Sequence, residues 1–271
     1  MKRLIVTADD VGLHPGMTRG ALAAHDGGIV TAVSVSPNGR DFEPAVELLR
    51  DRPRLDVGAH LTLVGERPLS DPARIPSLVG PDGLLHAKYP AFAARYALGH
   101  IRTADLETEL RAQVERLLAT GLRVVHLNSH QHLHLLPRVL DVVLELAEEH
   151  GIPVVRIPNE PAAGLSPRGL QIRALNALGR RARSGLFSAD RTVGVLAAGH
   201  LTAEALRRCL DDVDGTTELV CHPGLGGAEL AREYDWGYGW DEETAALADP
   251  ALPGFLEEKG ISLATFSEIL R

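Results

Sequence analysis

Histidine and carboxylate residues gather in a few short segments of this chain. The segment HLNSHQHLHLLP, residues 126–137, holds four histidines within nine positions. Asp9 and Asp10 are adjacent in TADD, while His60 and His222 stand in GAHLTL and CHPG. Imidazole and carboxylate groups bind divalent metals and are the commonest proton-transfer groups in enzymes. These residue types therefore predict a metal site, a proton-transfer site, or a polar loop without either role.

Asp9, Asp10 and His60 each have a structural alternative. The two aspartates follow an apolar run, and at a strand end they can diverge around one centre, one as a metal ligand and one as a general base. Alternatively, the pair caps the next turn. His60 lies in an apolar strand, where a lone histidine is more often a core residue than a ligand. The histidine-rich segment elsewhere shifts the interpretation toward a ligand.

The histidine-rich segment itself fits two geometries. A strand would place His126, Asn128 and His130 on one face, whereas a helix would align His126, His130 and His134. A valine pair before the segment and a proline after it favour strand, then loop, then helix. His130 would then lie just past the strand end, where a ligand is expected. His126 would orient a neighbour, and His132 and His134 would support the site or contact substrate, although at least one of the four is expected to be a plain loop residue.

Two imidazoles and one carboxylate occupy three positions on a divalent metal and leave room for water and a substrate oxygen. The metal would lower the pKa of the water and polarise a carbonyl. A free carboxylate could take the proton of the water, and a histidine opposite could protonate a leaving nitrogen. His222, between a strand and a Pro–Gly turn, suits the acid role, unless it is a turn histidine without a partner. The set predicts hydrolysis of an amide.

Strand-like and helix-like runs alternate along the chain. Strands are expected at 3–8, 29–36, 55–63, 124–128, 153–157, 217–222 and 261–266, and helices at 17–28, 42–53, 104–122, 137–151 and 202–213. This α/β alternation predicts about seven parallel strands in a distorted (β/α) barrel, one domain over 1–271, with its site at the carboxyl ends of the strands. Residues 168–200 are not assigned. The segment 63–83, rich in Pro and Gly, is long enough to be a functional loop.

Composition limits the classes of function. The chain has 271 residues and a net charge of −8 without a basic run, which argues against a nucleic-acid partner. Its two cysteines, Cys209 and Cys221, favour a reducing compartment. The first apolar run is too short for a signal peptide, and no run is long enough for a transmembrane segment. A cytoplasmic protein is expected.

Aromatic residues recur in REYDWGYGWDEE, residues 232–243, which contains Trp236, Tyr238 and Trp240 at every second position. Aromatic faces stack on the apolar face of sugar rings, so this segment predicts a carbohydrate-binding loop. A short strand or a homodimer contact is the alternative.

Four motifs in this order, TADDVGL, VGAHLTLV, HLNSHQHLHLLP and CHPG, resemble the YdjC-like carbohydrate deacetylases, also called the ChbG/HpnK family. The segments GERPLSDPARIPSLV and DWGYGW are most similar to the branch associated with hopanoid biosynthesis. The resemblance covers nearly the whole chain. It implies a distorted barrel, one divalent metal ion (Zn or Mg), and removal of an acetyl group from an N-acetylated amino sugar or glycolipid.

The resemblance also implies roles for single residues. It makes Asp10, His60 and His130 the metal ligands, Asp9 the general base and His222 the general acid. The expected substrate-binding residues are Arg156, His132, Trp236 and Trp240. The chain departs from the family at Asn128, where many members have Asp, and an amide supports a neighbouring imidazole less strongly than a carboxylate does.

Two other functions fit the same residues. A phosphoesterase is a second metal-dependent hydrolase for such a scaffold, although phosphoesterases often use two metals and more bridging carboxylates. A non-catalytic sugar- or metal-binding protein would need neither Asp9 nor His222.

Overall fold

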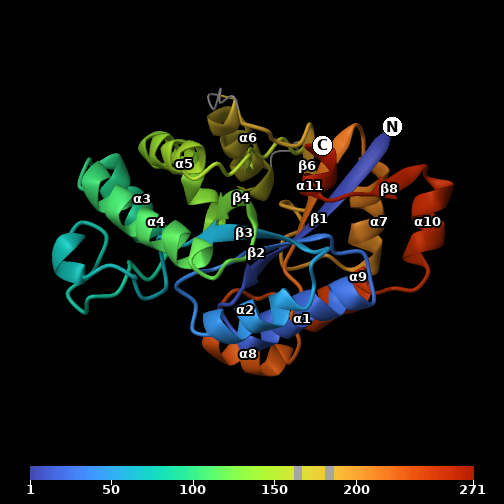
Figure 1. Ribbon diagram of the computed structural model, residues 1–271, viewed down its shortest axis with the longest axis horizontal. Coiled ribbons are helices and arrows are strands. Elements are labelled where there is room, and N and C mark those ends of the chain that lie inside the picture. The colour runs from blue at the N-terminus through green and yellow to red at the C-terminus, as the bar shows by residue number, and fades with distance from the viewer. Residues whose placement is uncertain (162–166, 181–185) are drawn as a thin grey trace.

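One curled sheet of parallel strands organises the computed structural model of this chain (Figure 1), which describes residues 1–161, 167–180 and 186–271. The strand order is β5-β4-β3-β2-β1-β7-β6, and β8 pairs in parallel with the first residues of β1. Seven strands thus form the main path of a half-barrel in a single-domain α/β fold. The predicted fold class is confirmed, with about seven parallel strands expected and β8 bringing the sheet to eight.

The bounds of the elements are as follows. The strands are β1 (Lys2–Val11), β2 (Ala32–Val35), β3 (Asp56–Leu61), β4 (Val124–Ser129), β5 (Val154–Val155), β6 (Arg191–Val193), β7 (Thr216–Cys221) and β8 (Ile261–Leu263). The helices are α1 (Pro15–Asp26), α2 (Phe42–Arg50), α3 (Tyr89–Ala97), α4 (Thr103–Leu118), α5 (Pro137–Glu149), α6 (Pro167–Gly179), α7 (Ala203–Asp211), α8 (Gly227–Glu233), α9 (Trp240–Leu247), α10 (Leu252–Glu258) and α11 (Phe266–Ile269), with 3-10 helices η1 (Pro72–Arg74) and η2 (His130–Leu135).

Several boundaries differ from the sequence prediction for local reasons. Helix α1 begins two residues earlier than predicted, because Pro15 fits the first turn and the His14 ring caps it by accepting from the Gly16 N–H. The predicted strand 261–266 ends at Leu263, because Thr265 caps α11. The unassigned stretch contains α6 and β6, and α3 follows the predicted functional loop.

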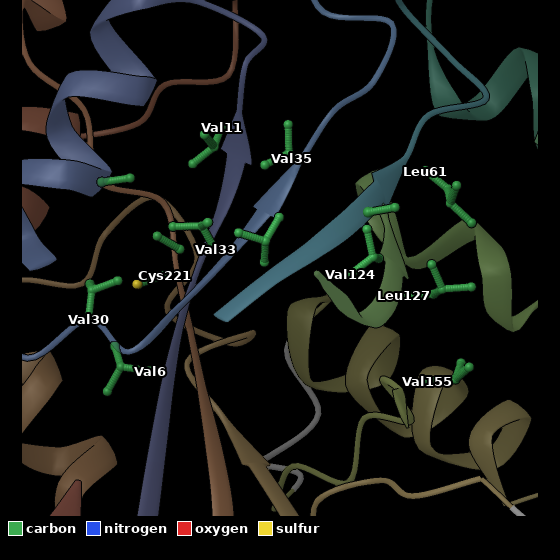
Figure 2. Close-up of a cluster of buried hydrophobic side chains, with 14 of the residues drawn as sticks. Val6, Val11, Val30, Val33, Val35, Leu61, Val124, Leu127, Val155 and Cys221 are labelled. Carbon is green, nitrogen blue, oxygen red and sulfur yellow. The ribbon is translucent and has the colours of Figure 1, made fainter. Parts of the chain in front are cut away.

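Apolar strands covered by helices form the core. In Figure 2, Val11 of β1 lies beside Val35 of β2, Val6 of β1 lies beside Val30, and Leu127 of β4 belongs to the same cluster. Parallel strands buried on both faces carry continuous apolar runs, which is why the strands were readable from the sequence. Among the described residues, no helix is both long enough and apolar enough to cross a bilayer.

The carboxyl ends of the strands meet at one edge of the sheet. Asp9 and Asp10 lie near the end of β1, His60 near the end of β3, and Asn128 near the end of β4. His222 directly follows β7. Because all pairings between these strands are parallel, the chemistry-bearing residues face a common region.

Candidate metal and catalytic site

Asp10, His60 and His130 form the most compact group of metal-type ligands at this edge. One carboxylate oxygen of Asp10, Oδ1, lies 3.1 Å from His60 Nε2 and 3.0 Å from His130 Nδ1. One ligand atom from each of the three residues lies within 4.8 Å of those of the other two. These three were predicted from three different strand ends, and the fold brings them together.

The backbone of β1 is irregular where it delivers the two aspartates. The pairing of β1 with β2 shifts register between Ala8 and Val11, and Asp10 has a φ of 64°. A regular strand would point Asp9 and Asp10 to opposite faces. The bulge and the left-handed conformation let both side chains face the site, at a cost of about 1–3 kcal/mol for a non-glycine residue.

Asn128 fixes the orientation of the His60 ring. Its Nδ2 donates to Asp9 Oδ1 at 2.9 Å and to Ser34 Oγ at 2.8 Å, so its Oδ1 faces His60 Nδ1 at 2.8 Å. An amide oxygen only accepts, and therefore His60 Nδ1 carries the donated proton. In the neutral ring, the buried Nε2 then presents a lone pair to the Asp10 carboxylate.

This arrangement fits a cation. His60 Nε2 is buried, has no hydrogen-bond partner among residues 1–161, 167–180 and 186–271, and faces Asp10, so two electron-rich groups lie 3.1 Å apart. Without a metal, a proton reconciles them: burial opposes the charged ring, but Asp9 and Asp10 outweigh burial and raise the pKa of His60 above 6.5. A divalent metal held by two imidazoles and a carboxylate would satisfy the same groups.

Asp9 is held by a buried arginine. Arg156 donates to both oxygens of Asp9, with Nη2 lying 3.0 Å from Oδ1, and also donates to Glu218 at 2.8 and 2.9 Å. Burial opposes ionisation of Asp9, but the Arg156 guanidinium outweighs it and holds the pKa of Asp9 well below its ordinary value. Asp9 therefore remains a carboxylate near neutral pH.

Arg156 itself lies behind Asp9. Its side chain is 1% exposed and does not line the cavity described below. The sequence predicted that Arg156 binds a substrate oxygen, but in the structure its guanidinium N–H groups donate to Asp9 and Glu218. The physical reason is that a buried guanidinium needs buried counter-charges, and two carboxylates supply them.

His222 contacts a carboxylate that the sequence interpretation missed. Its backbone N–H donates to Glu243 Oε1 in α9, and its ring Nδ1 lies 4.0 Å from the same oxygen. Burial lowers the pKa of His222 below 6.5, although Asp10 and Asp9 act in the opposite direction. Glu243 is the last letter of the aromatic segment quoted above, but no spacing pattern in the sequence links it to His222.

The other histidines of the segment 126–137 have different surroundings. His126 is buried, with Nε2 3.0 Å from Ser34 Oγ, and burial lowers its pKa to about 3. Its ring lies so close to Gly58 that a Cβ there would come within 2.3 Å. His134 bridges Ser129 Oγ and the Arg156 carbonyl, each at 2.7 Å, and is therefore structural. His132 lines the cavity, with a φ of 55°.

A cavity of about 430 Å³ opens over the site. Asp9, His60, His130, His132 and His222 line it on the polar side. The side chains of Ile172, Leu175, Leu178 and Val195 give it an aliphatic wall, and Trp236 and Tyr238 also border it.

The two tryptophans are neighbours, with ring centroids 6.2 Å apart, but they differ in exposure. The Trp236 ring centroid lies 5.0 Å from that of His130, and Trp236 lines the cavity. Trp240 is 1% exposed and packs with Leu13, Met17 and Leu230. Trp240 begins α9 and points into the core, so a sugar ring cannot reach its face. The two-residue spacing had predicted that a sugar would stack on it.

A second cavity of about 410 Å³ adjoins the first. The two share Tyr89, His130, Gln131 and Trp236 as walls. Glu66, from the predicted functional loop, lines the second cavity, and burial raises its pKa to about 7.

Another group of metal-type ligands is His14, Glu229 and Glu233, of which Glu233 lines the second cavity. His14 Nδ1 accepts from the Gly16 N–H, so in the neutral ring the proton is on Nε2, the nitrogen that faces Glu233. Arg40 already pairs with Glu233 at 2.6 Å. This group does not offer a free imidazole lone pair for a cation.

The curled parallel sheet and a His–His–Asp group at its carboxyl edge describe an α/β protein with a candidate metal-hydrolase site. Residues 3–258 match the family of YdjC-like proteins, and the chain belongs to this family. The family resemblance drawn from the four motifs is confirmed. The assignment to the hopanoid-associated branch stays a prediction.

Relatives of known name align along the full chain. A carbohydrate deacetylase of Geobacillus stearothermophilus is 34% identical over 98% of both chains. A human protein, also named carbohydrate deacetylase, is 32% identical over 98% of this chain and 91% of its own. Among solved structures, a candidate cellobiose-phosphate cleavage protein of Enterococcus faecalis superimposes with a TM-score of 0.79 and 25% identity, covering 99% of this chain and 98% of the other.

Proposed function

We propose that this protein is a carbohydrate deacetylase that uses one divalent metal ion to remove the acetyl group from an N-acetylated amino sugar. The observation that carries the proposal is the arrangement of Asp10, His60 and His130 beside the ionised Asp9, with His222 lining the same cavity. The names of the aligned relatives support the reaction class. Neither a phosphoesterase nor a non-catalytic binding protein is favoured by them.

Asp10, His60 and His130 would hold the metal. Asn128 keeps the His60 Nδ1 proton in place, so that Nε2 is free to bind. When bound, a divalent metal would supply Lewis acidity toward an acyl oxygen and make a nearby water more acidic. Zn and Mg are both compatible with the ligand set, since imidazole favours the former and carboxylate the latter.

Asp9 and His222 would move the protons. Asp9 accepts the proton of the attacking water as the new C–O bond forms, and Arg156 and Asn128 hold its carboxylate in place. His222 gives a proton to the amide nitrogen as the C–N bond breaks. The products are acetate and the amino sugar with its amine protonated, so atoms and charges balance with one water consumed.

The cavity walls suit a substrate that joins a sugar to an apolar group. Trp236 offers an aromatic face next to His130, and His132 offers a polar group on the same wall. The aliphatic wall from α6 and Val195 would contact an apolar part of the substrate, in keeping with a glycolipid. Arg156 and Trp240, which do not line the cavity, would act through Asp9 and through packing.

Acetate release tests the proposal. The purified protein, stripped of metal and then supplied with Zn²⁺ or Mg²⁺, should release acetate from at least one member of a panel of N-acetylated mono-, oligo- and lipid-linked saccharides. A lipid-linked acceptor should be preferred if the chain belongs to the hopanoid-associated branch. Release of phosphate from matched sugar phosphates, without acetate release from any N-acetylated member, would contradict the proposal. Cytoplasmic location and a homodimer stay predictions.

A further inference from the structure

Glu243 is a buried carboxylate that the proposed reaction does not use. It lies in the first turn of α9 and is 1% exposed. Its Oε1 accepts from the His222 backbone N–H. Within the described residues no donor reaches its Oε2 in good hydrogen-bond geometry, although the Leu201 backbone also stabilises the carboxylate. Buried carboxylate oxygens without partners are rare, so this one requires a reason.

Within the described ranges, His222 also has a buried polar atom without a hydrogen bond. Its ring Nδ1 is buried, has no hydrogen-bond partner in the part of the chain that the structure describes, and lies 4.0 Å from Glu243 Oε1. The same ring lines the cavity over the metal ligands. Two adjacent side chains thus each hold a buried polar atom that the other could satisfy after a small rotation of the carboxylate.

Helix α9 holds the whole turn that follows β7. Asp241 accepts from the backbone N–H groups of Gly226 and Gly227 at 2.9 and 2.8 Å, and Thr244 donates to the Gly224 carbonyl at 2.8 Å. Both residues reach only backbone atoms. Glu243 alone of the three lies beside the imidazole ring, which separates its role from that of Asp241 and Thr244.

We propose that Glu243 is a positioning residue for His222, accepting the Nδ1 proton of the ring so that Nε2 faces the cavity as the proton donor. The inference rests on the acid role of His222 in the proposed function. A carboxylate on one ring nitrogen fixes the tautomer of the other and stabilises the charged ring. Burial raises the pKa of Glu243 to about 7, and a charged imidazole beside it would offset that unfavourable burial.

A double-mutant cycle tests the inference with the full-length protein and a fixed metal concentration. Glu243→Gln should lower kcat at least about tenfold with little change in KM, since removing a proton-transfer group altogether costs roughly 10²–10⁴-fold. In a His222→Ala background, adding Glu243→Gln should change kcat less than about twofold, because Glu243 acts through the ring.

The outcomes separate the two hypotheses. If His222→Ala lowers kcat and Glu243→Gln lowers it further by its full factor, Glu243 does not act through His222, and only the further inference fails. If His222→Ala keeps full kcat, the acid role of His222 fails as well. Asp241→Asn is the matched control on the same helix: it loosens the turn without touching the ring. An equal loss of kcat in Asp241→Asn and Glu243→Gln would assign the effect to the turn and overturn the inference.

NMR of the unmodified protein tests the tautomer of His222 directly and does not require a variant that folds. In the unmodified protein labelled with ¹⁵N-histidine, the His222 ring should show its proton on Nδ1 when neutral. A neutral ring with its proton on Nε2 would overturn the proposal, whatever the variants do.

Discussion

The Oδ1 atom of Asn128 lies 2.8 Å from Nδ1 of His60, and this contact links the candidate metal ligands to the candidate base. The same amide donates to Asp9 Oδ1 at 2.9 Å. One side chain therefore sets the tautomer of His60 and solvates the charge of Asp9. A carboxylate at this position could do the first but would repel Asp9.

Asn128→Asp should move the acidic limb of the kcat/KM profile to higher pH. Asp9 must be ionised to act as a base, and in the native site its pKa is held well below the ordinary value despite burial. A second carboxylate within 3 Å would raise the pKa of the pair, by roughly one unit or more. Activity would then be lost at a higher pH during acidification. Asn128→Ala, which adds no charge, is the control, and an acidic limb in Asn128→Asp that matches the wild type would refute the expectation.

His60→Ala should lose bound metal and regain part of its activity when metal is added in excess. The variant removes one of the three proposed ligands and leaves the strand in place. Metal content after dialysis, measured by elemental analysis, gives the answer. His14→Asn, which keeps a capping oxygen at the start of α1, should retain its metal. Unchanged metal content in the His60 variant would remove His60 from the ligand set.

Asp9→Asn and His222→Ala should keep their metal but lose rate. Neither residue belongs to the proposed ligand group, and each is proposed to move a proton. The expected loss in kcat/KM is roughly 10²–10⁴-fold for each variant. The pH profile of the wild type should be bell-shaped, and the alkaline limb should weaken in His222→Ala. An Asp9→Asn protein with full metal and full rate would exclude Asp9 as the base.

The two tryptophans should respond oppositely to truncation. Trp236→Ala should raise KM, because the ring lines the cavity, and should lower the melting temperature less than Trp240→Ala, because Trp236 is only partly buried at the edge of the same cluster. Trp240→Ala should lower the free energy of unfolding by about 3–5 kcal/mol, since a fully buried indole leaves a large void. Parallel measurements of KM and thermal unfolding would decide; a Trp240 variant of native stability with a raised KM would contradict the core assignment.

Glu243→Gln should stabilise the protein above neutral pH. Burial raises the pKa of Glu243 from 4.5 to about 7. Between these values the native state binds more protons than the unfolded chain, so the carboxyl makes the free energy of unfolding fall as pH rises, by roughly 3 kcal/mol at most. Replacing the titrating carboxyl by an amide should therefore raise the free energy of unfolding at pH 8 and change it little at pH 4. Chemical denaturation at both values tests this, with exposed Glu242→Gln as the control. A variant less stable than wild type at pH 8 would contradict it.

The candidate metal ligands could be predicted from the sequence, because the ends of apolar strands can be recognised in it. Asp10, His60 and His130 each follow or end an apolar run, and parallel strands bring such positions to one edge. Sequence reasoning could not identify Glu243, because a carboxylate in a helix after a long loop shows no pattern that points inward. It also gave Trp240 the same sugar-binding role as Trp236. The two rings do lie side by side, but period-two spacing does not reveal that α9 starts at Trp240 and that its ring is buried.

Local geometry at the site was also beyond the sequence. The left-handed backbone at Asp10 is not favoured by the residue itself and arises from the bulge between β1 and β2. Arg156 was correctly seen at a strand end, but the direction of its side chain depends on Glu218, a residue of β7 that no motif marked.

The place of β1 in the sheet has a consequence for biosynthesis. Its neighbour β2 follows within a few dozen residues, whereas β7, which pairs with Arg3 through Ala8 on the other side, is made only after residue 215. While the ribosome is still translating the middle of the gene, the apolar run of β1 is an unpaired edge, the kind of surface that recruits strands from other chains. Nascent chains that stall before Cys221 should therefore be the aggregation-prone species, and a chaperone acting on this protein would have to cover β1 until β7 has been made.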